Sequence, residues 1–402
     1  MEFKSKDNLI KEVLTKQIDK IYPSKESLAK ILKSGKILTI YWGIDPTAHS
    51  LHIAHGANLF ILRRFQNLGH KAIVLLGDFT AQIGDPSDRR AKRVSLTEKQ
   101  VLSNLKNYKK QIFKILDPKK TTVKFNSEWW RKVSAKNLLD LARLITHQRI
   151  IDRHMFQERI KKGETITVEE LLYPIIQGYD SVALNTDIEL GGTDQLFNML
   201  VGRDLEKILL KKEKFVITKP ILSHPKTGEM LMSKTSGGAI FISESADQMY
   251  GKIMALTDEV IIECFKLCTD TDDSRIRSIE SCLKAGENPR NLKSELAFEI
   301  VKIYHGEKKA KEAAEEFERI FKRHELPENI QEVSITIKPR KLIELLMQAG
   351  LASSRSEARR KVLENAVKVD GKVKKDPEEV IDVYEGAVVQ YGKRNFRKIK
   401  KG

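Results

Sequence analysis

The sequence predicts a doubly wound α/β fold, in which a parallel sheet is followed by an all-helical domain and a small α+β module. Two apolar segments, residues 39–44 and 71–76, are typical of buried strands, and a stretch with helical spacing separates them. A strand, a helix and a second strand in this order form a parallel βαβ unit. From residue 243 to about residue 323 the apolar spacing is almost entirely helical.

The 402 residues are enough for two or three domains with separate cores. We expect an N-terminal helical segment over residues 1–38, an α/β domain over 39–240, a helical domain over 241–325, a linker over 326–338 and a C-terminal domain over 339–402. Hydrophobic residues make up 41% and charged residues 32% of the chain, which is typical of a globular protein in water.

Charge and cysteine content indicate the partners and the compartment. Seventy-two Lys and Arg against 55 Asp and Glu give a net charge of +17, which suits a polyanionic partner. The first 20 residues are charged and no apolar run could span a bilayer, so we expect no membrane association. Three cysteines without further ligands nearby predict free thiols, no metal site and a cytoplasmic protein.

The first strand leads directly into a candidate ligand site. It ends at the turn Asp45-Pro46-Thr47, and helical spacing begins near Leu51. Open α/β sheets bind ligands where a strand delivers its carboxyl end to a helix, and the helix amino terminus favours phosphate. His52 and His55 are three residues apart and should project from the same side of the first helical turn.

Polar residues follow the next two strands. The glycine-rich loop at residues 77–87 matches neither common phosphate-binding fingerprint, so a nucleotide must be held in another way. Residues 121–125 alternate like a third strand, and Asn126 follows at its end. Further on, Tyr173, Gln177 and Asp180 share one helix face beside apolar residues. A half-buried carboxylate needs hydrogen-bond donors, so this stripe predicts a polar pocket.

Three blocks carry a resemblance to a known family. The string Gly43-x-Asp45-Pro46-Thr47-Ala48-x-Ser50-Leu51-His52-x-x-His55 resembles the HIGH signature of class I aminoacyl-tRNA synthetases in its tyrosyl form. The Tyr-Gln-Asp stripe followed by Gly191-Gly192-Thr193-Asp194-Gln195 resembles the amino-acid pocket of the same enzymes. Met232-Ser233-Lys234 resembles their KMSKS loop. The blocks stand in the order found in bacterial tyrosyl-tRNA synthetases.

The resemblance implies a Rossmann-like catalytic domain and a tyrosine–tRNA ligase activity. Such an enzyme joins L-tyrosine to ATP as tyrosyl-adenylate, releases pyrophosphate, and passes tyrosine to the 3′ end of tRNA(Tyr). The reaction depends on positioning and on stabilisation of charge at the phosphates. ATP would be accompanied by Mg²⁺, and the family also implies a homodimer.

By resemblance, each predicted site residue has a role. The catalytic residues are Thr47, His52, His55 and Lys234. The ATP-binding residues are Gly43, Asp45, His52, His55, Gly192, Asp194, Met232 and Lys234. The tyrosine-binding residues are Tyr41, Asp85, Asn126, Tyr173, Gln177, Asp180 and Gln195, with Tyr41 and Asp180 at the phenol.

Three departures leave alternatives open. Ala54 replaces the usual glycine of HIGH, and Leu231 replaces the first lysine of KMSKS, while Thr235 replaces its last serine. Ala54 and Leu231 favour an inactive relative that only binds RNA. A tryptophanyl enzyme shares the fold, but an indole offers one donor and no acceptor to Tyr41 and Asp180. Pyrophosphate exchange with tyrosine separates these readings.

The C-terminal domain is basic. Residues 339–402 contain 16 Lys and Arg and 9 Asp and Glu, a net charge of +7. The region over 349–372 resembles a small RNA-binding module shared by a ribosomal small-subunit protein, pseudouridine synthases and bacterial tyrosyl synthetases. The resemblance implies an RNA-binding role for Arg355, Arg359, Arg360 and Lys361, although a charged surface helix is an alternative.

Overall fold

The computed structural model describes residues 5–87, 96–232, 238–322, 330–392 and 395–402. The chain forms two compact units, Met1–Ala314 and Glu315–Gly402. The domain boundaries expected from the sequence stay predictions. Within the described residues, no helix is both long enough and apolar enough to cross a membrane.

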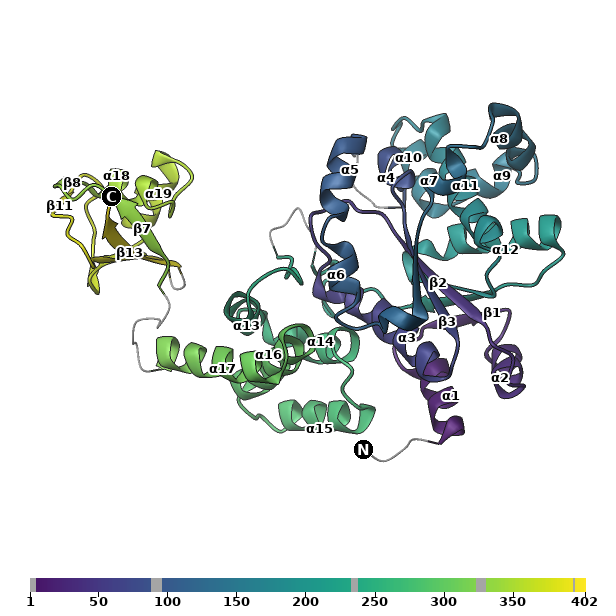
Figure 1. The fold of residues 1–402 in the computed structure, drawn as a ribbon, viewed down its shortest axis with the longest axis horizontal. Coiled ribbons are helices and arrows are strands. Elements are labelled where there is room, and N and C mark those ends of the chain that lie inside the picture. Colours follow the sequence, from purple (N-terminus) through teal and green to yellow (C-terminus); the bar gives the residue numbers. More distant parts are fainter. Residues whose placement is uncertain (1–4, 88–95, 233–237, 323–329, 393–394) are drawn as a thin grey trace. The chain divides into compact units, whose positions relative to one another are not determined.

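The larger unit is built on a six-stranded sheet with the order β1-β6-β5-β2-β3-β4 (Figure 1). The strands are β1 (Lys20–Tyr22), β2 (Thr39–Ile44), β3 (Lys71–Leu76), β4 (Thr121–Phe125), β5 (Ile188–Gly192) and β6 (Phe215–Lys219). Strands β2 to β6 are parallel, and β1 pairs antiparallel with β6. The chain adds β3 and β4 on one side of β2, and β5 and β6 on the other. Ligands bind at the carboxyl ends of the strands beside such a reversal.

Helices that follow the strands cover the sheet. Helix α3 (Gly56–Asn67) packs on β2 and β3, and α12 (Leu196–Leu210) packs on β5 and β6. Helix α11 (Val168–Leu184) packs closely on α12, where an added methyl on Gly178 would lie 2.9 Å from the backbone nitrogen of Gly202. The shorter elements are α1 (Lys6–Thr15), α2 (Lys25–Lys33), η1 (Ile53–His55), α4 (Thr80–Ile83), α5 (Glu98–Leu105), α6 (Tyr108–Ile112), η2 (Pro118–Lys120), α7 (Ser127–Trp130) and η3 (Thr193–Gln195).

A small helical layer connects β4 to α11. It consists of α8 (Ala135–Ala142), α9 (His147–Ile151) and α10 (His154–Lys161). With α7, α11 and α12 these helices share an apolar cluster that includes Trp130, Phe156 and Leu205. The cluster fixes α7 against α11, which places Trp129 and Trp130 beside the polar stripe of α11.

A helical region follows the sheet within the same unit. It consists of α13 (Ala246–Met254), η4 (Asp258–Val260), α14 (Ile261–Cys268), α15 (Asp273–Lys284), α16 (Pro289–His305) and the first half of α17 (Glu307–Lys322), since the boundary between the units falls within α17 after Ala314. Helix α14 lies against α3 and η1.

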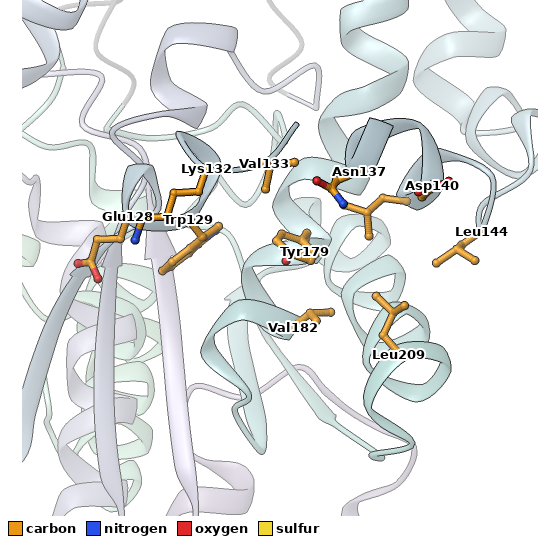
Figure 2. Close-up of a pocket in the computed structure, with 11 residues that line it drawn as sticks. Glu128, Trp129, Lys132, Val133, Asn137, Asp140, Leu144, Tyr179, Val182 and Leu209 are labelled. Atoms are coloured by element: carbon orange, nitrogen blue, oxygen red, sulfur yellow. The ribbon is translucent and has the colours of Figure 1, made fainter. Parts of the chain in front are cut away.

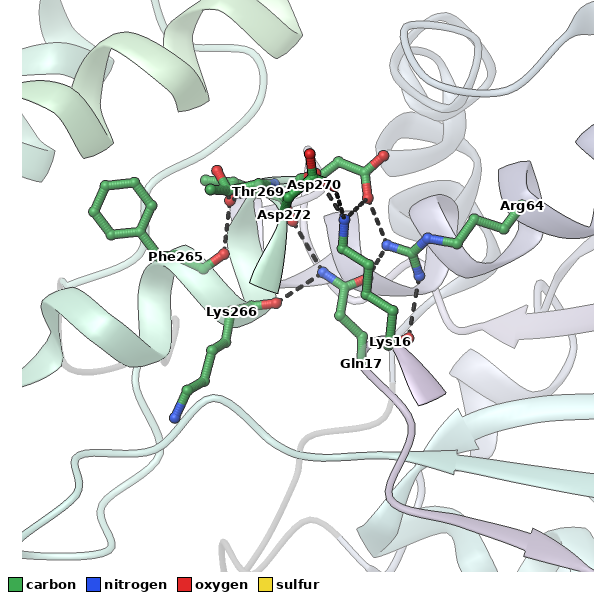
Figure 3. A network of polar contacts seen from close by, with 9 residues as sticks. Lys16, Gln17, Arg64, Phe265, Lys266, Thr269, Asp270 and Asp272 are labelled. Atoms are coloured by element: carbon green, nitrogen blue, oxygen red, sulfur yellow. Dashed lines mark hydrogen bonds and ion pairs between the residues drawn. The ribbon is translucent and has the colours of Figure 1, made fainter. Parts of the chain in front are cut away.

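Ion pairs reinforce the contact between α3 and α14. Arg64 Nη2 on α3 lies 2.6 Å from Asp270 Oδ1, just beyond α14, and Lys16 Nζ lies 3.0 Å from the same oxygen. The Gln17 amide donates to the carbonyls of Lys266 and Thr269 (Figure 3). Burial raises the pKa of Asp270, but the charges of Arg64 and Lys16 bring it below its usual value. The end of α1, helix α3 and the end of α14 are therefore held together.

The C-terminal unit has its own core. Its strands are β7 (Glu332–Ile335), β8 (Arg340–Lys341), β9 (Val367–Val369), β10 (Lys372–Val373), β11 (Val380–Ile381), β12 (Val388–Tyr391) and β13 (Asn395–Lys401), and its helices are α18 (Leu342–Gln348) and α19 (Arg355–Leu363). Strands β10-β9-β12-β13-β7 form one sheet, and β8 pairs with β11. Strand β7 lies within the expected linker and pairs in parallel with β13.

The predicted fold class is confirmed. Strands β2, β3 and β4 occupy the residues that the apolar pattern predicted. The sequence analysis did not identify β1, β5 or β6. Strand β5 contains a glutamate and two glycines, a composition unlike that of a buried strand, and β1 has only 3 residues.

Candidate active site

The candidate site lies at the carboxyl ends of β2, β3 and β5, where the strand order reverses. Gly43 is exposed although β2 is a central strand, and a methyl group added to it would meet only Leu75, at 3.9 Å. The sheet is therefore open to solvent above this point. Asp45 follows β2 and accepts hydrogen bonds from Thr80 Oγ1 at 2.6 Å and from the Tyr173 hydroxyl at 3.0 Å. Asp45 thus joins the ends of β2 and β3 to α11.

The two histidines lie side by side at the entry to α3. His52 precedes η1, and α3 begins at Gly56. The His52 backbone N–H donates to His55 Nδ1 at 3.1 Å, and the ring centroids lie 3.6 Å apart. Because Nδ1 of His55 accepts a hydrogen bond, the proton of its neutral ring is on Nε2. Thr47 lies in the preceding turn, where its backbone N–H donates to the Asp45 carbonyl at 2.8 Å.

The chain that follows the KMSKS-like segment lies beside these histidines. The Ile53 N–H donates to the Ile240 carbonyl at 3.0 Å, and the Ile242 N–H donates to the Leu51 carbonyl at 2.8 Å. Met232, within the segment, is buried. Lys234 and the neighbouring residues 233–237 lie outside the described residues, so its predicted role stays a prediction.

A polar chain connects the loop after β3 to α12. Gln195 Nε2 donates to Asp85 Oδ2 at 2.7 Å and to Asp194 Oδ2 at 3.1 Å. Asn198 Nδ2 donates to Gln177 Oε1 at 2.8 Å. Gly192 ends β5, and an added methyl group there would lie 2.3 Å from Asp194 Oδ1, so a larger residue would displace the Asp194 side chain.

Asp180 is buried among nitrogen donors. Its Oδ1 accepts from the indole nitrogens of Trp129 at 2.8 Å and Trp130 at 2.9 Å, and its Oδ2 accepts from Asn126 Nδ2 at 3.2 Å. Burial raises the pKa of Asp180 to about 7. The nearby charge of Asp45 also raises this pKa, whereas the three donors lower it. The carboxylate is therefore close to the point at which it gains a proton near neutral pH.

Tyr41 contacts Ser181, the residue that follows Asp180 on α11. Its hydroxyl is 2.7 Å from Ser181 Oγ, which donates to Glu189 Oε2 at 3.0 Å. Burial and the charge of Glu189 raise the pKa of Tyr41 well above its usual value. The phenol of Tyr41 thus stays protonated and can take part in hydrogen bonds as a neutral group.

The structure brings most of the predicted residues to one edge of the sheet, and it adds others. The sequence analysis did not identify Thr80, Trp129, Trp130, Ser181 or Asn198 as site residues. The only available signal was the position of the two tryptophans directly after Asn126 at a strand end. Their indole N–H groups require partners when buried, which could have linked them to a carboxylate.

The four basic residues predicted to bind RNA lie on α19. Ser354 caps the helix by accepting from the Glu357 N–H at 3.2 Å, and Ala358 and Val362 face the core. Arg359 Nη2 lies 2.5 Å from Glu378, and Lys361 Nζ lies 2.6 Å from Glu364. The remaining basic residues, Arg355 and Arg360, are exposed.

Two family models match the chain. The family model described as tRNA synthetases class I (W and Y) matches residues 33–322, and the model of the tyrosine–tRNA ligase SYY-like C-terminal domain matches residues 322–399. The fold and the site therefore define a class I aminoacyl-tRNA synthetase.

Similar proteins identify the family of the chain within this class. The chain is 42% identical to the tyrosine–tRNA ligase of Moorella thermoacetica, over 96% of this chain and 94% of the relative, and 40% identical to that of Thermotoga maritima, over 97% of each. The tyrosyl-tRNA synthetase of Archaeoglobus fulgidus, solved with L-tyrosine, has a similar fold, with a TM-score of 0.59 and 18% identity over 77% of this chain and 100% of that chain. The chain belongs to the tyrosine–tRNA ligase family.

Proposed function

We propose that the chain activates L-tyrosine with ATP and transfers it to the 3′ end of tRNA(Tyr), using the residues gathered at the carboxyl ends of β2, β3 and β5. The observation that carries this proposal is the buried Asp180 carboxylate, which is held by Trp129, Trp130 and Asn126 and lies next to Ser181, the partner of Tyr41. A pocket built to bond a hydroxyl group rejects an analogue that lacks it by roughly 10⁴–10⁵, for which the handling of phenylalanine by tyrosyl enzymes is the standard example.

At the phosphate side, His52, His55, Thr47 and Lys234 would stabilise the charge that develops while pyrophosphate leaves. The Nε2–H of His55 is a suitable donor because its other ring nitrogen is already occupied by a backbone N–H. Asp194 would bind the ribose beside Gly192, and Gly43, Asp45 and Met232 would complete the nucleotide site. Preorganised donors of this kind stabilise a transition state without reorganisation.

At the amino-acid side, Asp85, Tyr173 and Gln177 would hold the ammonium group of tyrosine. Gln195, which donates to Asp85 at 2.7 Å, and Asn126, which supports Asp180, would complete the pocket. Tyr41 and Asp180 would bond the phenol oxygen. In this arrangement the carboxylate of tyrosine faces the α-phosphorus, and positioning supplies much of the rate enhancement.

We expect Mg²⁺ to enter with ATP. Mg²⁺ usually keeps several waters and takes ligands from substrate phosphates. Across the described parts of the chain, no group of three or more His, Cys, Asp or Glu side chains is arranged to hold a metal ion. The carboxylates near the phosphate side, Asp45 and Asp194, are the oxygen donors that fit such an ion.

The C-terminal unit is proposed to bind tRNA. The net charge of +7 over residues 339–402 and the exposed Arg355, Arg359 and Arg360 on α19 favour contacts with phosphates. Binding through such contacts should weaken as salt is raised. We also propose a cytoplasmic location, which the proposed tRNA substrate and the free thiols of Cys264, Cys268 and Cys282 favour.

A second copy of the chain is proposed to cover an apolar surface on α8 and α11. A cavity of about 600 Å³ opens there, and its lining includes Trp129, Leu144 and Tyr179 (Figure 2). Leu209, which also lines it, is 44% exposed. Large exposed apolar side chains around a hollow are typical of an interface. Sedimentation of the full chain would test this: a homodimer is expected, and a monomer at micromolar concentration would contradict it.

Pyrophosphate exchange tests the proposed activity. Exchange of label into ATP is expected with tyrosine and not with phenylalanine or tryptophan. Exchange with tryptophan would indicate the tryptophanyl alternative, and no exchange with any amino acid would indicate an inactive relative that only binds RNA.

A further inference from the structure

A buried ion pair lies behind Tyr41. Lys214 precedes β6 and its side chain is 0% exposed, while the side chain of Glu189 on β5 is 4% exposed, and the two are in direct contact. Lys214 Nζ also donates to Ser181 Oγ at 2.6 Å. Tyr41 and Glu189 are register partners on β2 and β5, so their side chains leave the sheet on the same face.

The neighbouring helix leaves space for the ammonium group. A methyl group added to Gly202 on α12 would lie 2.8 Å from both Lys214 Nζ and Ser181 Oγ. Any residue larger than glycine would displace one of these atoms. A buried ion pair is a poor source of stability, since well-packed apolar residues in its place are often neutral or stabilising. A role in positioning therefore explains the arrangement better than a role in folding.

Counting hydrogens limits the directions of the chain of hydrogen bonds. A serine hydroxyl has one proton, and that of Ser181 goes either to the Glu189 carboxylate at 3.0 Å or to the Tyr41 hydroxyl at 2.7 Å. The Lys214 ammonium has no lone pair, so it can only donate to Ser181. In the first case Tyr41 donates to Ser181, and in the second case it donates to Glu189, with which it also forms a hydrogen bond. In both cases the Tyr41 proton in the empty protein is directed to a buried partner and not to a substrate.

Tyrosine requires the opposite direction. If its phenol donates to Asp180, the phenol oxygen needs a donor. Tyr41 can donate to it only by turning its proton away from Ser181 and Glu189, and the Ser181 proton is then directed to Tyr41. Lys214 donates to Glu189 and to Ser181 in both states, so the carboxylate stays paired during the change. Phenylalanine brings no oxygen and leaves the chain of hydrogen bonds as it is.

We propose that Ser181, Glu189 and Lys214 are positioning residues that set the direction of the Tyr41 hydroxyl proton and thereby contribute to the selection of tyrosine over phenylalanine. This inference rests on the proposed role of Tyr41 and Asp180 at the phenol. None of the three positioning residues needs to touch the substrate.

The test is the ratio of kcat/KM for tyrosine to kcat/KM for phenylalanine in pyrophosphate exchange. Ser181→Ala should lower this ratio about 10-fold, the factor for one neutral hydrogen bond, and should leave phenylalanine activation unchanged. The paired exchange Lys214→Met with Glu189→Leu removes both charges together and should lower the ratio to a similar extent. A purely structural defect would instead lower both kcat/KM values equally.

Tyr41→Phe separates this inference from the proposed function. If Tyr41→Phe alone leaves the ratio unchanged, the proposed role of Tyr41 is wrong. If Tyr41→Phe lowers the ratio and a folded Ser181→Ala protein keeps the parent ratio, only the positioning inference is overturned. The inference also requires that adding Ser181→Ala to Tyr41→Phe causes no further loss, because both changes act through the same hydroxyl.

Discussion

The indole nitrogen of Trp130 lies 2.9 Å from Oδ1 of Asp180, which is 3% exposed. This contact joins the turn after β4 to the polar face of α11. It holds a carboxylate in a site where burial raises its pKa to about 7. The carboxylate can therefore accept a hydrogen bond from a phenol, and burial makes its charged form unfavourable.

Tyrosine activation should depend on pH through Asp180. The carboxyl group gains a proton as the pH falls through about 7, and it then no longer accepts a hydrogen bond from the phenol. We expect kcat/KM for tyrosine to rise between pH 6 and pH 8. The profile for Asp180→Asn should lack this rise. The same rise in both proteins would show that another group titrates.

The stability of the protein should show the same titration with the opposite sign. The pKa of Asp180 is raised from 3.8 to about 7 in the folded state, so between these values the folded protein holds a proton that the unfolded chain has released. The free energy of unfolding should fall as pH rises through this window, by no more than roughly 4 kcal/mol. The Tm of Asp180→Asn should therefore rise relative to the Tm of the parent protein from pH 5 to pH 8. A constant difference would contradict the raised pKa.

Ala54→Gly should tighten ATP binding. Ala54 lies in η1 between the two histidines. It stands at the glycine of the HIGH signature, which the resemblance implies lies against the nucleotide. Removing the methyl group should lower the Kd for ATP and leave tyrosine binding unchanged. The same change should lower the free energy of unfolding by ~1 kcal/mol, because glycine has a lower helix propensity than alanine, and this loss does not affect the affinity for ATP. Equal Kd values in calorimetric titrations would mean that the backbone already accommodates the methyl group.

Leu231 should limit the first step of the reaction. Leu231 stands at the first lysine of the KMSKS signature. The Leu231 backbone N–H donates to the Leu222 carbonyl at 2.9 Å, and the Leu231 side chain carries no charge. Lys234 must then stabilise the pyrophosphate oxygens with less help, so Lys234→Ala should slow adenylate formation at least ~10²-fold. Leu231→Lys should speed it without changing tyrosine binding. Single-turnover rates measure both. If Lys234→Ala formed adenylate at the rate of the parent protein, this segment would have no part in catalysis.

Removal of the C-terminal unit should abolish efficient tRNA charging and spare adenylate formation. Because β7 pairs with β13, the cut belongs after α17, near Lys322, and not after β7. The shortened chain should catalyse tyrosine-dependent pyrophosphate exchange at the parent rate and charge tRNA poorly. As a matched control, Arg355→Ala with Arg360→Ala in the full chain should weaken charging most at low salt and make it less dependent on salt, because fewer phosphate contacts remain. Loss of exchange in a folded shortened chain would contradict this division of labour.

Much of the fold follows from local patterns, and the missing parts depend on tertiary contacts. Strands β2, β3 and β4 are apolar or alternating runs with turn residues at their ends, so the sequence defines them to the residue. Strand β5 carries Glu189, which is tolerated there only because Lys214 and Ser181 contact it. No local pattern reveals such partners.

The candidate site divides in the same way. Motif spacing identifies His52, Asp180 and Gln195, but it cannot show that Asp45 joins Thr80 to Tyr173. These contacts join the ends of different strands to one helix, and their register depends on how the sheet is assembled. Residues that support a site from behind are therefore the ones that the sequence leaves out.

The most direct test of the account is the Tyr/Phe ratio of kcat/KM in pyrophosphate exchange for the parent, Asp180→Asn and Asp85→Asn. Asp180→Asn loses the charged acceptor of the phenol, a hydrogen bond of about 1.5–3 kcal/mol, so its ratio should fall at least ~10-fold while the Kd for ATP stays the same. Asp85→Asn is the control, because the ammonium group is common to both amino acids and its ratio should match the parent. An unchanged ratio in Asp180→Asn would contradict the central claim that this carboxylate selects tyrosine.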